Sequence, residues 1–230
     1  MKDLEGRTRY MLPRRCYTLI RIDGKSFHTY TKGLKKPFDM DLIEDMQKTT
    51  LKLCKETGAK IGYVQSDEIS LVLTDFKENG TQSWFDNNLQ KVCSVTASIA
   101  TAEFNLARFS RNGLSEKTAH FDTRVWTVSD PWDVYNTFLW RQKDASKNSI
   151  QMVARSLASH KECTNKNEKM LQELIFSKGQ NWNDYPTICK RGTFVYKTDE
   201  EWIVDLEAPI LTQDKKWFFD KLPMIEQPSF

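Results

Sequence analysis

The sequence predicts an α+β fold: an antiparallel sheet built on a split βαβ, ferredoxin-like unit, with helices on one face and a helical and β-hairpin C-terminal extension. Segments with strand and helix patterns follow one another in the order strand, helix, strand, strand, helix, strand. The helical segments carry apolar residues at intervals of three and four, whereas the strand segments are short runs rich in β-branched and aromatic residues.

The first strand is expected at 17–22, a β-rich run that ends at the turn pair Asp23-Gly24. A helix is expected over 39–57, because its apolar residues recur at helical spacing, Asp39 can cap its start and Gly58 suits the position after its end. The remaining elements of the unit are expected as strands at 61–64, 69–73 and 124–128 and a helix at 84–109.

The C-terminal extension opens at Asp130-Pro131, a cap followed by a first-turn proline, and its helix is expected to reach residue 157 either continuously or with a kink near Asp144. A helix at 167–178 and a hairpin of 193–197 against 202–205 follow, and 206–230 is left unassigned. We therefore expect residues 1–130 to form the core and residues 131–230 an extension that packs on it, in one compact unit.

Right-handed crossover makes the first two strands of such a unit parallel and inserts the third between them, antiparallel to both. Asp23 ends the first strand and Asp67 lies in the turn after the second. Both carboxylates are therefore expected at the same edge of the sheet, on neighbouring strands.

Composition narrows the class of protein. No run of eighteen apolar residues is present and residues 1–7 lack the apolar stretch of a secretory signal, so neither a membrane partner nor secretion is expected. The five cysteines form no CxxC pair, which favours reduced thiols and a cytoplasmic location. Residues 1–36 carry a net charge of about +7, ten basic against three acidic side chains. This charge indicates a polyanionic partner such as a nucleotide or RNA, or else a solvated basic face.

Two carboxylates at one sheet edge are what a two-metal nucleotidyl-transfer site needs, because Mg²⁺ is held by one or two protein carboxylates together with phosphate oxygens and water. Gly24 would let a metal or phosphate approach the backbone closely, and Ser66 could offer a donor to a phosphate. Asp-Gly and Ser-Asp-Glu are also ordinary turn sequences, so spacing alone leaves the metal interpretation open.

A loop with four lysines follows the first acidic position. Lys25, Lys32, Lys35 and Lys36 surround His28 in a segment that leaves the same sheet edge, so it could cover a triphosphate. A solvated basic loop explains the lysines equally well, and a lone histidine is more often structural or exposed than catalytic.

Several motifs together resemble the tRNA-His guanylyltransferase family, the 3′–5′ polymerases. The segments 21–28 (Arg-Ile-Asp-Gly-Lys-Ser-Phe-His) and 65–68 (Gln-Ser-Asp-Glu) are similar to its two acidic motifs, and Lys36-Pro37 to the Lys-Pro segment between them. In order and at compatible spacing, further likenesses follow at 121–125 (Phe-Asp-Thr-Arg-Val), 140–142 (Trp-Arg-Gln) and 191–193 (Arg-Gly-Thr). Any one motif is weak, whereas the ordered set over 15–197 is specific.

The resemblance implies a polymerase-type palm over residues 1–130, in which two Mg²⁺ ions are bound by the side chains of Asp23 and Asp67 and the carbonyl of Gly24. It further implies that Glu68 lies beside the metals, and that Lys36 and His28 stabilise charge or position the substrate. Asp23, Asp67, Glu68 and Lys36 are the catalytic residues it implies. The nucleotide triphosphate would be contacted by Asp23, Gly24, Lys25, Ser26, Phe27, His28, Ser66 and Asp67.

The activity implied is addition of GTP, or of templated nucleotides, to the 5′ end of tRNA after activation with ATP, in a homotetramer or other homo-oligomer. Eukaryotic members carry a His-Ile-Asn-Asn motif where this chain has Ser146-Lys147-Asn148-Ser149. In lacking this His, the chain resembles the guanylyltransferase-like branch of the family, which can repair truncated tRNA 5′ ends by templated addition. Asn148 remains a candidate substrate contact. The candidates for RNA contact are basic residues away from the metals: Arg108, Arg111, Lys147, Arg155, Lys161, Lys166 and Lys169.

Two other functions fit the same pattern. A GTP-using nucleotide cyclase-type palm enzyme would share the acidic edge, although the Gly-Gly-Asp-Glu-Phe signature of dinucleotide cyclases is replaced by Gln65-Ser66-Asp67-Glu68-Ile69. A non-catalytic RNA-binding palm protein is the second alternative, which the two filled acidic positions weaken.

Overall fold

The computed structural model describes residues 1–76, 80–115 and 117–224. Its strands are β1 (Tyr17–Gly24), β2 (Ile61–Gln65), β3 (Glu68–Leu73), β4 (Phe121–Val128), β5 (Thr193–Lys197) and β6 (Trp202–Asp205). Its longer helices are α3 (Met40–Thr57), α4 (Leu89–Asn112), α5 (Pro131–Leu157) and α7 (Glu168–Ser177). Shorter helices are α1 (Lys2–Gly6), α2 (Phe27–Tyr30), η1 (Trp84–Asn87), α6 (His160–Cys163), η2 (Trp182–Asp184), α8 (Thr187–Arg191) and α9 (Lys215–Phe219).

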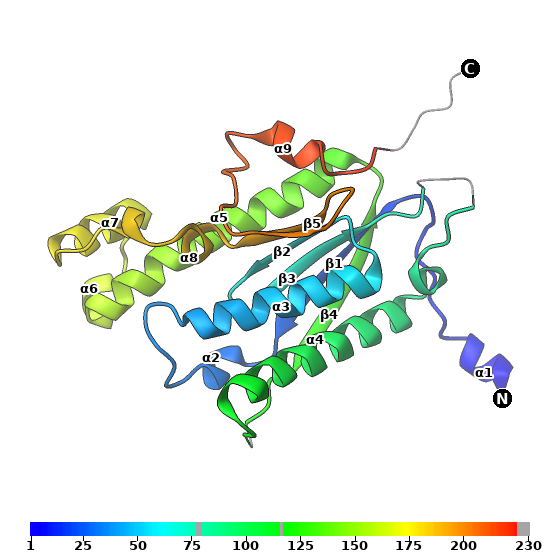
Figure 1. Cartoon of the computed structure of the whole chain (residues 1–230), viewed down its shortest axis with the longest axis horizontal. Coiled ribbons are helices and arrows are strands. Elements are labelled where there is room, and N and C mark those ends of the chain that lie inside the picture. Colours follow the sequence, from blue (N-terminus) through cyan, green and yellow to red (C-terminus); the bar gives the residue numbers. More distant parts are fainter. Residues whose placement is uncertain (77–79, 116, 225–230) are drawn as a thin grey trace.

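The described strands form one six-stranded sheet in the order β4-β1-β3-β2-β5-β6, and every neighbouring pair is antiparallel. β3 lies between the parallel strands β1 and β2, which confirms the predicted split βαβ topology. The hairpin β5–β6 of the C-terminal half extends the sheet by pairing with β2. Figure 1 shows α3 and α4 side by side in front of this sheet and α5 behind it.

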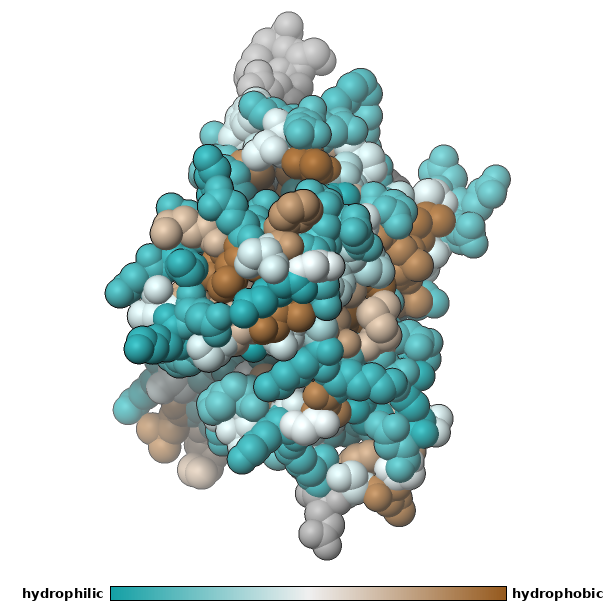
Figure 2. All heavy atoms as spheres, turned by 90° about the vertical axis from the view of Figure 1, so that its left-hand side faces the viewer, coloured by the Kyte–Doolittle hydropathy of each residue, from teal (hydrophilic) through white to brown (hydrophobic). Residues whose placement is uncertain are grey.

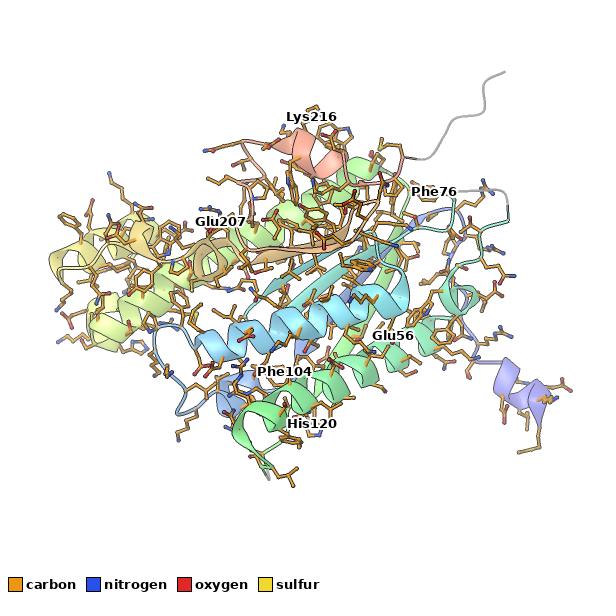
Figure 3. All side chains as sticks on the ribbon, viewed as in Figure 1. Glu56, Phe76, Phe104, His120, Glu207 and Lys216 are labelled. Carbon is orange, nitrogen blue, oxygen red and sulfur yellow. The ribbon has the colours of Figure 1, made fainter. Side chains whose placement is uncertain are left out.

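Alternation along β1 divides the hydrophobic core between the two faces of the sheet. Ile20 and Ile22 pack with α3 and α4, where Phe104 (labelled in Figure 3) is fully buried. Leu19 packs on the opposite face with Phe138 of α5. The two helices of the split unit thus share one face, as expected, and the extension covers the other. Arg21 and Asp23 continue the series of Leu19, so their side chains belong to the α5 face.

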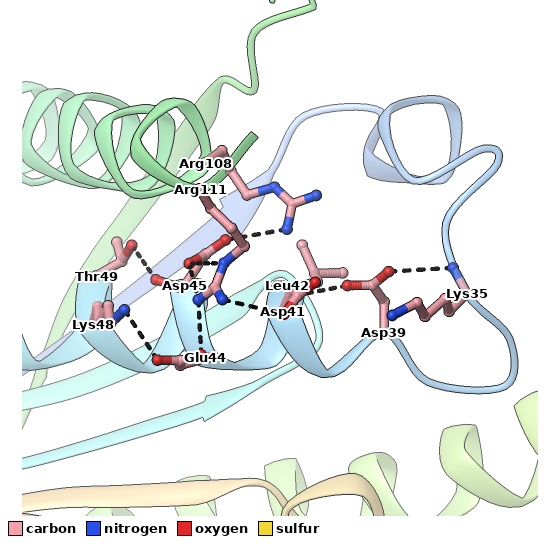
Figure 4. Close-up of polar contacts among 10 residues, drawn as sticks. All are labelled: Lys35, Asp39, Asp41, Leu42, Glu44, Asp45, Lys48, Thr49, Arg108 and Arg111. Atoms are coloured by element: carbon pink, nitrogen blue, oxygen red, sulfur yellow. Dashed lines mark hydrogen bonds and ion pairs between the residues drawn. The ribbon is translucent and has the colours of Figure 1, made fainter. Parts of the chain in front are cut away.

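Buried charge joins α3 to α4 (Figure 4). Asp45 of α3 is fully buried and accepts hydrogen bonds from Arg108 at 3.1 Å and from Arg111 at 3.0 Å. Asp39 caps α3 by accepting from the Leu42 amide, as predicted. The two arginines therefore fix α4 against α3, and the contact with RNA expected of them stays a prediction.

The described elements differ from the prediction at the start of α4 and in the tail, whereas α5 takes the first of its two predicted forms. α4 begins at Leu89 rather than residue 84, because Asn88 caps it and the preceding residues form a 3₁₀ turn. α5 runs continuously through Asp144. The unassigned tail contains α9, whose Phe218 is buried against α5, while residues 225–230 lie outside the described part of the chain. Within that described part, no helix combines the length and apolarity that crossing a membrane requires.

Candidate active site

The turn between β2 and β3 brings the two predicted acidic positions together. Asp23 lies opposite Glu68 in the β1–β3 register, and the amide of Gly24 donates to the carbonyl of Asp67 at 3.2 Å. A Cβ placed on Gly24 would come within 2.9 Å of the Asp67 Cβ and within 2.3 Å of Phe27 Cδ2. Only glycine therefore allows the two strand ends to approach this closely.

Burial and neighbouring negative charge act together on Asp67. Burial raises the pKa of its carboxyl above the ordinary value, the charges of Asp23 and Glu68 raise it further, and a hydrogen bond from Ser66 Oγ at 3.0 Å opposes them. Burial removes water from the Asp67 carboxylate, and Asp23 and Glu68 repel its negative charge, so among the described residues the ionised form lacks a positive partner. A hard divalent cation with oxygen ligands would supply it, so this pair of carboxylates fits Mg²⁺.

Glu68 is held by two arginines. Its carboxylate accepts from Arg21 Nη2 of β1 and from Arg141 Nη1 of α5, each at 2.5 Å. Arg21 Nη2 also lies 3.6 Å from Asp23 Oδ1. Glu68 thus lies beside the acidic pair, as expected, but both of its oxygens are engaged by guanidinium groups.

A cleft of about 440 Å³ opens between this sheet edge and α5. From the sheet side it is lined by Asp23, His28, Gln65, Ser66, Asp67 and Glu68, and from α5 by Asp144, Asn148, Gln151, Met152 and Arg155. A volume of this size is typical of small-molecule sites. Figure 2 faces the end of the molecule at which α6 and α7 lie, where the surface is mainly hydrophilic with separate hydrophobic patches.

The residues of the loop after β1, which are expected from the sequence to surround the nucleotide, take different positions relative to the cleft. His28 lines the cleft, whereas Lys25 and Ser26 are exposed next to it. The Phe27 ring is buried among Tyr30 and other aromatic side chains, so a contact with nucleotide could come only from its backbone. Lys36 is exposed in the loop before α3 and is absent from the described lining of the cleft.

Comparison with known proteins decides the family. The family model described as tRNAHis guanylyltransferase matches residues 1–129, more than half of the chain. The chain belongs to the tRNAHis guanylyltransferase family. The curated relatives of this family include the tRNA(His) guanylyltransferase of Saccharomyces cerevisiae, 26% identical over 87% of this chain and 90% of its own.

Two solved structures of the family are more similar. One, described as a bacterial tRNA(His) guanylyltransferase (Thg1)-like protein in complex with ATP, is 45% identical, with a TM-score of 0.91 over 96% of both chains. The other, described as such a protein in complex with GTP, is 42% identical, with a TM-score of 0.83 over 96% of both chains. The polymerase-type palm predicted for this family is therefore the fold of this chain.

Sequence reasoning missed most of the α5 side of the cleft. The sequence patterns assign no functional role to Asp144, Gln151 or Met152, and Arg141 enters only as part of a motif. Asp144, Asn148, Gln151 and Arg155 recur at intervals of four, three and four residues, which places them on one face of a helix. This polar stripe could have identified the wall, but only the docking of α5 shows that it faces Asp23 and Asp67.

Proposed function

We propose that this chain is a nucleotidyltransferase that adds GTP, or templated nucleotides, to the 5′ end of tRNA in the 3′–5′ direction, with GTP and ATP as substrates. The observation that carries the proposal is the meeting of Asp23 and Asp67 at one edge of a cleft large enough for a small-molecule ligand. The similarity to bacterial relatives solved with ATP and with GTP supports a nucleotide as that ligand.

Two Mg²⁺ ions would be held by the carboxylates of Asp23 and Asp67 and the carbonyl of Gly24. When bound, Mg²⁺ supplies charge neutralisation of the triphosphate and of the attacking and leaving oxygens. The remaining catalysis is positioning, because holding the 3′-hydroxyl of GTP and the activated 5′ phosphate in line removes most of the entropic barrier.

The chain's own groups would divide the positioning between the two walls. On the sheet side, Ser66, His28 and the exposed segment at Lys25-Ser26 would donate to phosphate oxygens. On the α5 side, Asn148 and Arg155 face the cleft and can contact the second substrate. Lys36 could contribute charge only if its loop moved toward the cleft.

Glu68 acts in this proposal as a positioning residue. Its ion pairs with Arg21 and Arg141 tie β1, β3 and α5 together beside the acidic pair. The two guanidinium groups also keep its negative charge from adding in full to that of Asp23 and Asp67.

Templated repair of tRNA 5′ ends is the form of the activity that we favour, because Ser146 stands in place of the His of eukaryotic members and because the 45% identical structure is described as a Thg1-like protein. We further propose that the chain works in the cytoplasm as a homotetramer or other homo-oligomer. The arrangement of 1–130 as catalytic core and 131–230 as extension belongs to the same proposal.

The test follows incorporation of labelled GTP with Mg²⁺ and ATP into full-length tRNA-His bearing a 5′-monophosphate and into tRNAs that lack their first nucleotide. We expect templated addition to the truncated set, and loss of addition by at least about 1,000-fold in Asp23→Asn and Asp67→Asn, because each removes a ligand charge. Asp199→Asn is the matched control, since Asp199 is an exposed carboxylate on the β5–β6 turn, at the opposite end of the sheet.

Addition only to tRNA-His would replace repair by dedicated guanylylation. Consumption of GTP without RNA would favour a cyclase-type enzyme, and tight tRNA binding without turnover would favour a binding protein. Full activity in both Asp variants would end the assignment of the site.

A further inference from the structure

A second cavity, of about 210 Å³, lies at the other end of the strands that carry the acidic pair. It is enclosed by the start of β1, the end of β3, the end of α3 and the segment that leads into α4. Its described lining is Thr18, Thr57, Gly58, Leu73, Thr74, Asp75, Gln82, Ser83, Trp84, Asn87 and Val92.

Buried oxygens that lack a hydrogen-bond partner gather in this cavity. Among the residues that the structure describes, the side-chain oxygens Thr74 Oγ1, Asp75 Oδ2 and Ser83 Oγ are buried without a partner, and all three residues line it. Buried polar groups in native proteins are nearly always hydrogen-bonded, because an unpaired one forfeits its interaction with water. Several orphaned oxygens around one cavity therefore indicate that it holds something which donates hydrogen bonds.

Asp75 gives the cavity its charge. The residue is 5% exposed, and its Oδ1 already accepts from the Arg15 amide at 2.8 Å. Among the described residues, Arg14 makes an ion pair with Oδ2 through Nε at 3.6 Å but no hydrogen bond, and the Arg14 side chain is half exposed. One oxygen of a buried carboxylate is thus free to accept from a ligand.

The remaining walls are apolar or aromatic, with Leu73, Val92 and the ring of Trp84. Such walls suit a compact apolar body, and an aromatic face beside a carboxylate attracts a cation. A bare metal ion fits less well, since Ca²⁺ takes six to eight oxygen ligands and Mg²⁺ six. An anionic ligand is disfavoured, because the negative charge of Asp75 would repel it.

We propose that this cavity is a binding site for a small organic cation, a primary ammonium or an amidinium carried on a compact apolar body. Its N–H groups donate to Asp75 Oδ2 and to the hydroxyls of Thr74 and Ser83, and its apolar part lies against Trp84. The volume equals roughly seven water molecules at about 30 Å³ each, which accommodates a benzyl-sized group.

The site is separate from the active-site cleft. Thr18 and Asp23 are five residues apart on β1, which corresponds to about 17 Å along the strand, and in the described chain the two cavities share no lining residue. Binding here therefore does not require the proposed transferase activity, and each proposal can fail without the other.

The experiment titrates the whole chain with benzylamine and with benzamidine, by calorimetry and by amide chemical shifts. Benzyl alcohol and benzoate are the neutral and anionic counterparts of the same size. We expect saturable binding of the cations, shift changes at Thr74, Trp84 and Val92, and affinity for benzyl alcohol and for benzoate at least about tenfold weaker, as loss of a charge-assisted hydrogen bond implies.

Variants locate the interaction. Asp75→Asn keeps the acceptor for the Arg15 amide and should weaken cation binding at least about tenfold. Ser83→Ala, which removes one orphaned hydroxyl without touching Asp75, should weaken it less. Asp86→Asn is the matched control, because Asp86 also pairs with Arg14 but lies outside the described lining.

Four results would overturn the proposal: no saturable cation binding, equal binding of benzoate, shift changes confined to the Asp23 edge, or unchanged affinity in both Asp75→Asn and Ser83→Ala. In the first case the cavity holds only water.

Discussion

Glu68→Ala tests how the acidic edge is kept available for cations. In the structure Glu68 engages Arg21 at 2.5 Å, while the same guanidinium nitrogen lies 3.6 Å from Asp23. Removal of Glu68 frees Arg21 to pair with Asp23, where it would compete with the Mg²⁺ that we propose binds there. We therefore expect the variant to need more Mg²⁺ for half-maximal activity.

The size of the effect follows from Coulomb's law. At about 4 Å a unit ion pair is worth about 1 kcal/mol in water and about 4 kcal/mol at an effective dielectric constant of 20. The side chains of Arg21 and Asp23 are 22% and 33% exposed, so water reaches both and the energy lies between these two figures. A competing pair of about 1.4 kcal/mol corresponds to a tenfold higher Mg²⁺ requirement.

The assay measures GTP incorporation into truncated tRNA as a function of Mg²⁺ concentration. The double variant Glu68→Ala/Arg21→Gln should restore much of the original Mg²⁺ requirement, because the competing cation is gone. A fall in kcat with an unchanged Mg²⁺ midpoint would refute the reasoning and give Glu68 a direct role in the reaction.

Three other perturbations address the fold. Asp45→Ala should lower the free energy of unfolding by about 3–5 kcal/mol in urea denaturation, because it leaves the buried Arg108 without its carboxylate partner. Gly24→Ala should cost about 1–3 kcal/mol by the same measurement, since the new methyl group meets the Phe27 ring at 2.3 Å. Carboxyl NMR should find the pKa of Glu162 at about 2, below its ordinary 4.5, because the backbone N–H of the cap residue Ser159 donates a hydrogen bond to the charged carboxylate. Its contribution to stability should be complete above pH 4.5 and lost as the pH falls toward 2.

Each of these three predictions has a control variant in the same protein. Asp41→Ala removes an exposed partner of Arg111 and should cost no more than about 1 kcal/mol; a loss equal to that of Asp45→Ala would contradict the role given to burial. A methyl group at Gly80 meets no atom of the described residues within 4 Å, so Gly80→Ala should leave stability nearly unchanged. Ser159→Ala should move the Glu162 midpoint upward, and an unmoved midpoint would show that the hydroxyl does not contribute.

Local patterns were sufficient for most elements of the core. Helical spacing and an Asp cap located α3 to within one residue, because both signals lie inside the segment itself. The start of α4 was placed five residues too early, since 84–88 has helix-compatible composition but folds into a 3₁₀ turn before Asn88 caps the helix. The sequence predicts no element around Phe218, because a five-residue helix has too little periodicity to detect.

The sequence by itself determined that Asp23 and Asp67 share an edge, because the handedness of a strand–helix–strand crossover leaves one arrangement. Only the tertiary structure decided what surrounds them. Arg141 reaches Glu68 across 73 residues of chain, and the wall of the cleft exists because α5 docks on one face of the sheet. Such pairings depend on how whole elements pack, whereas periodicity and capping report only on neighbours within one element.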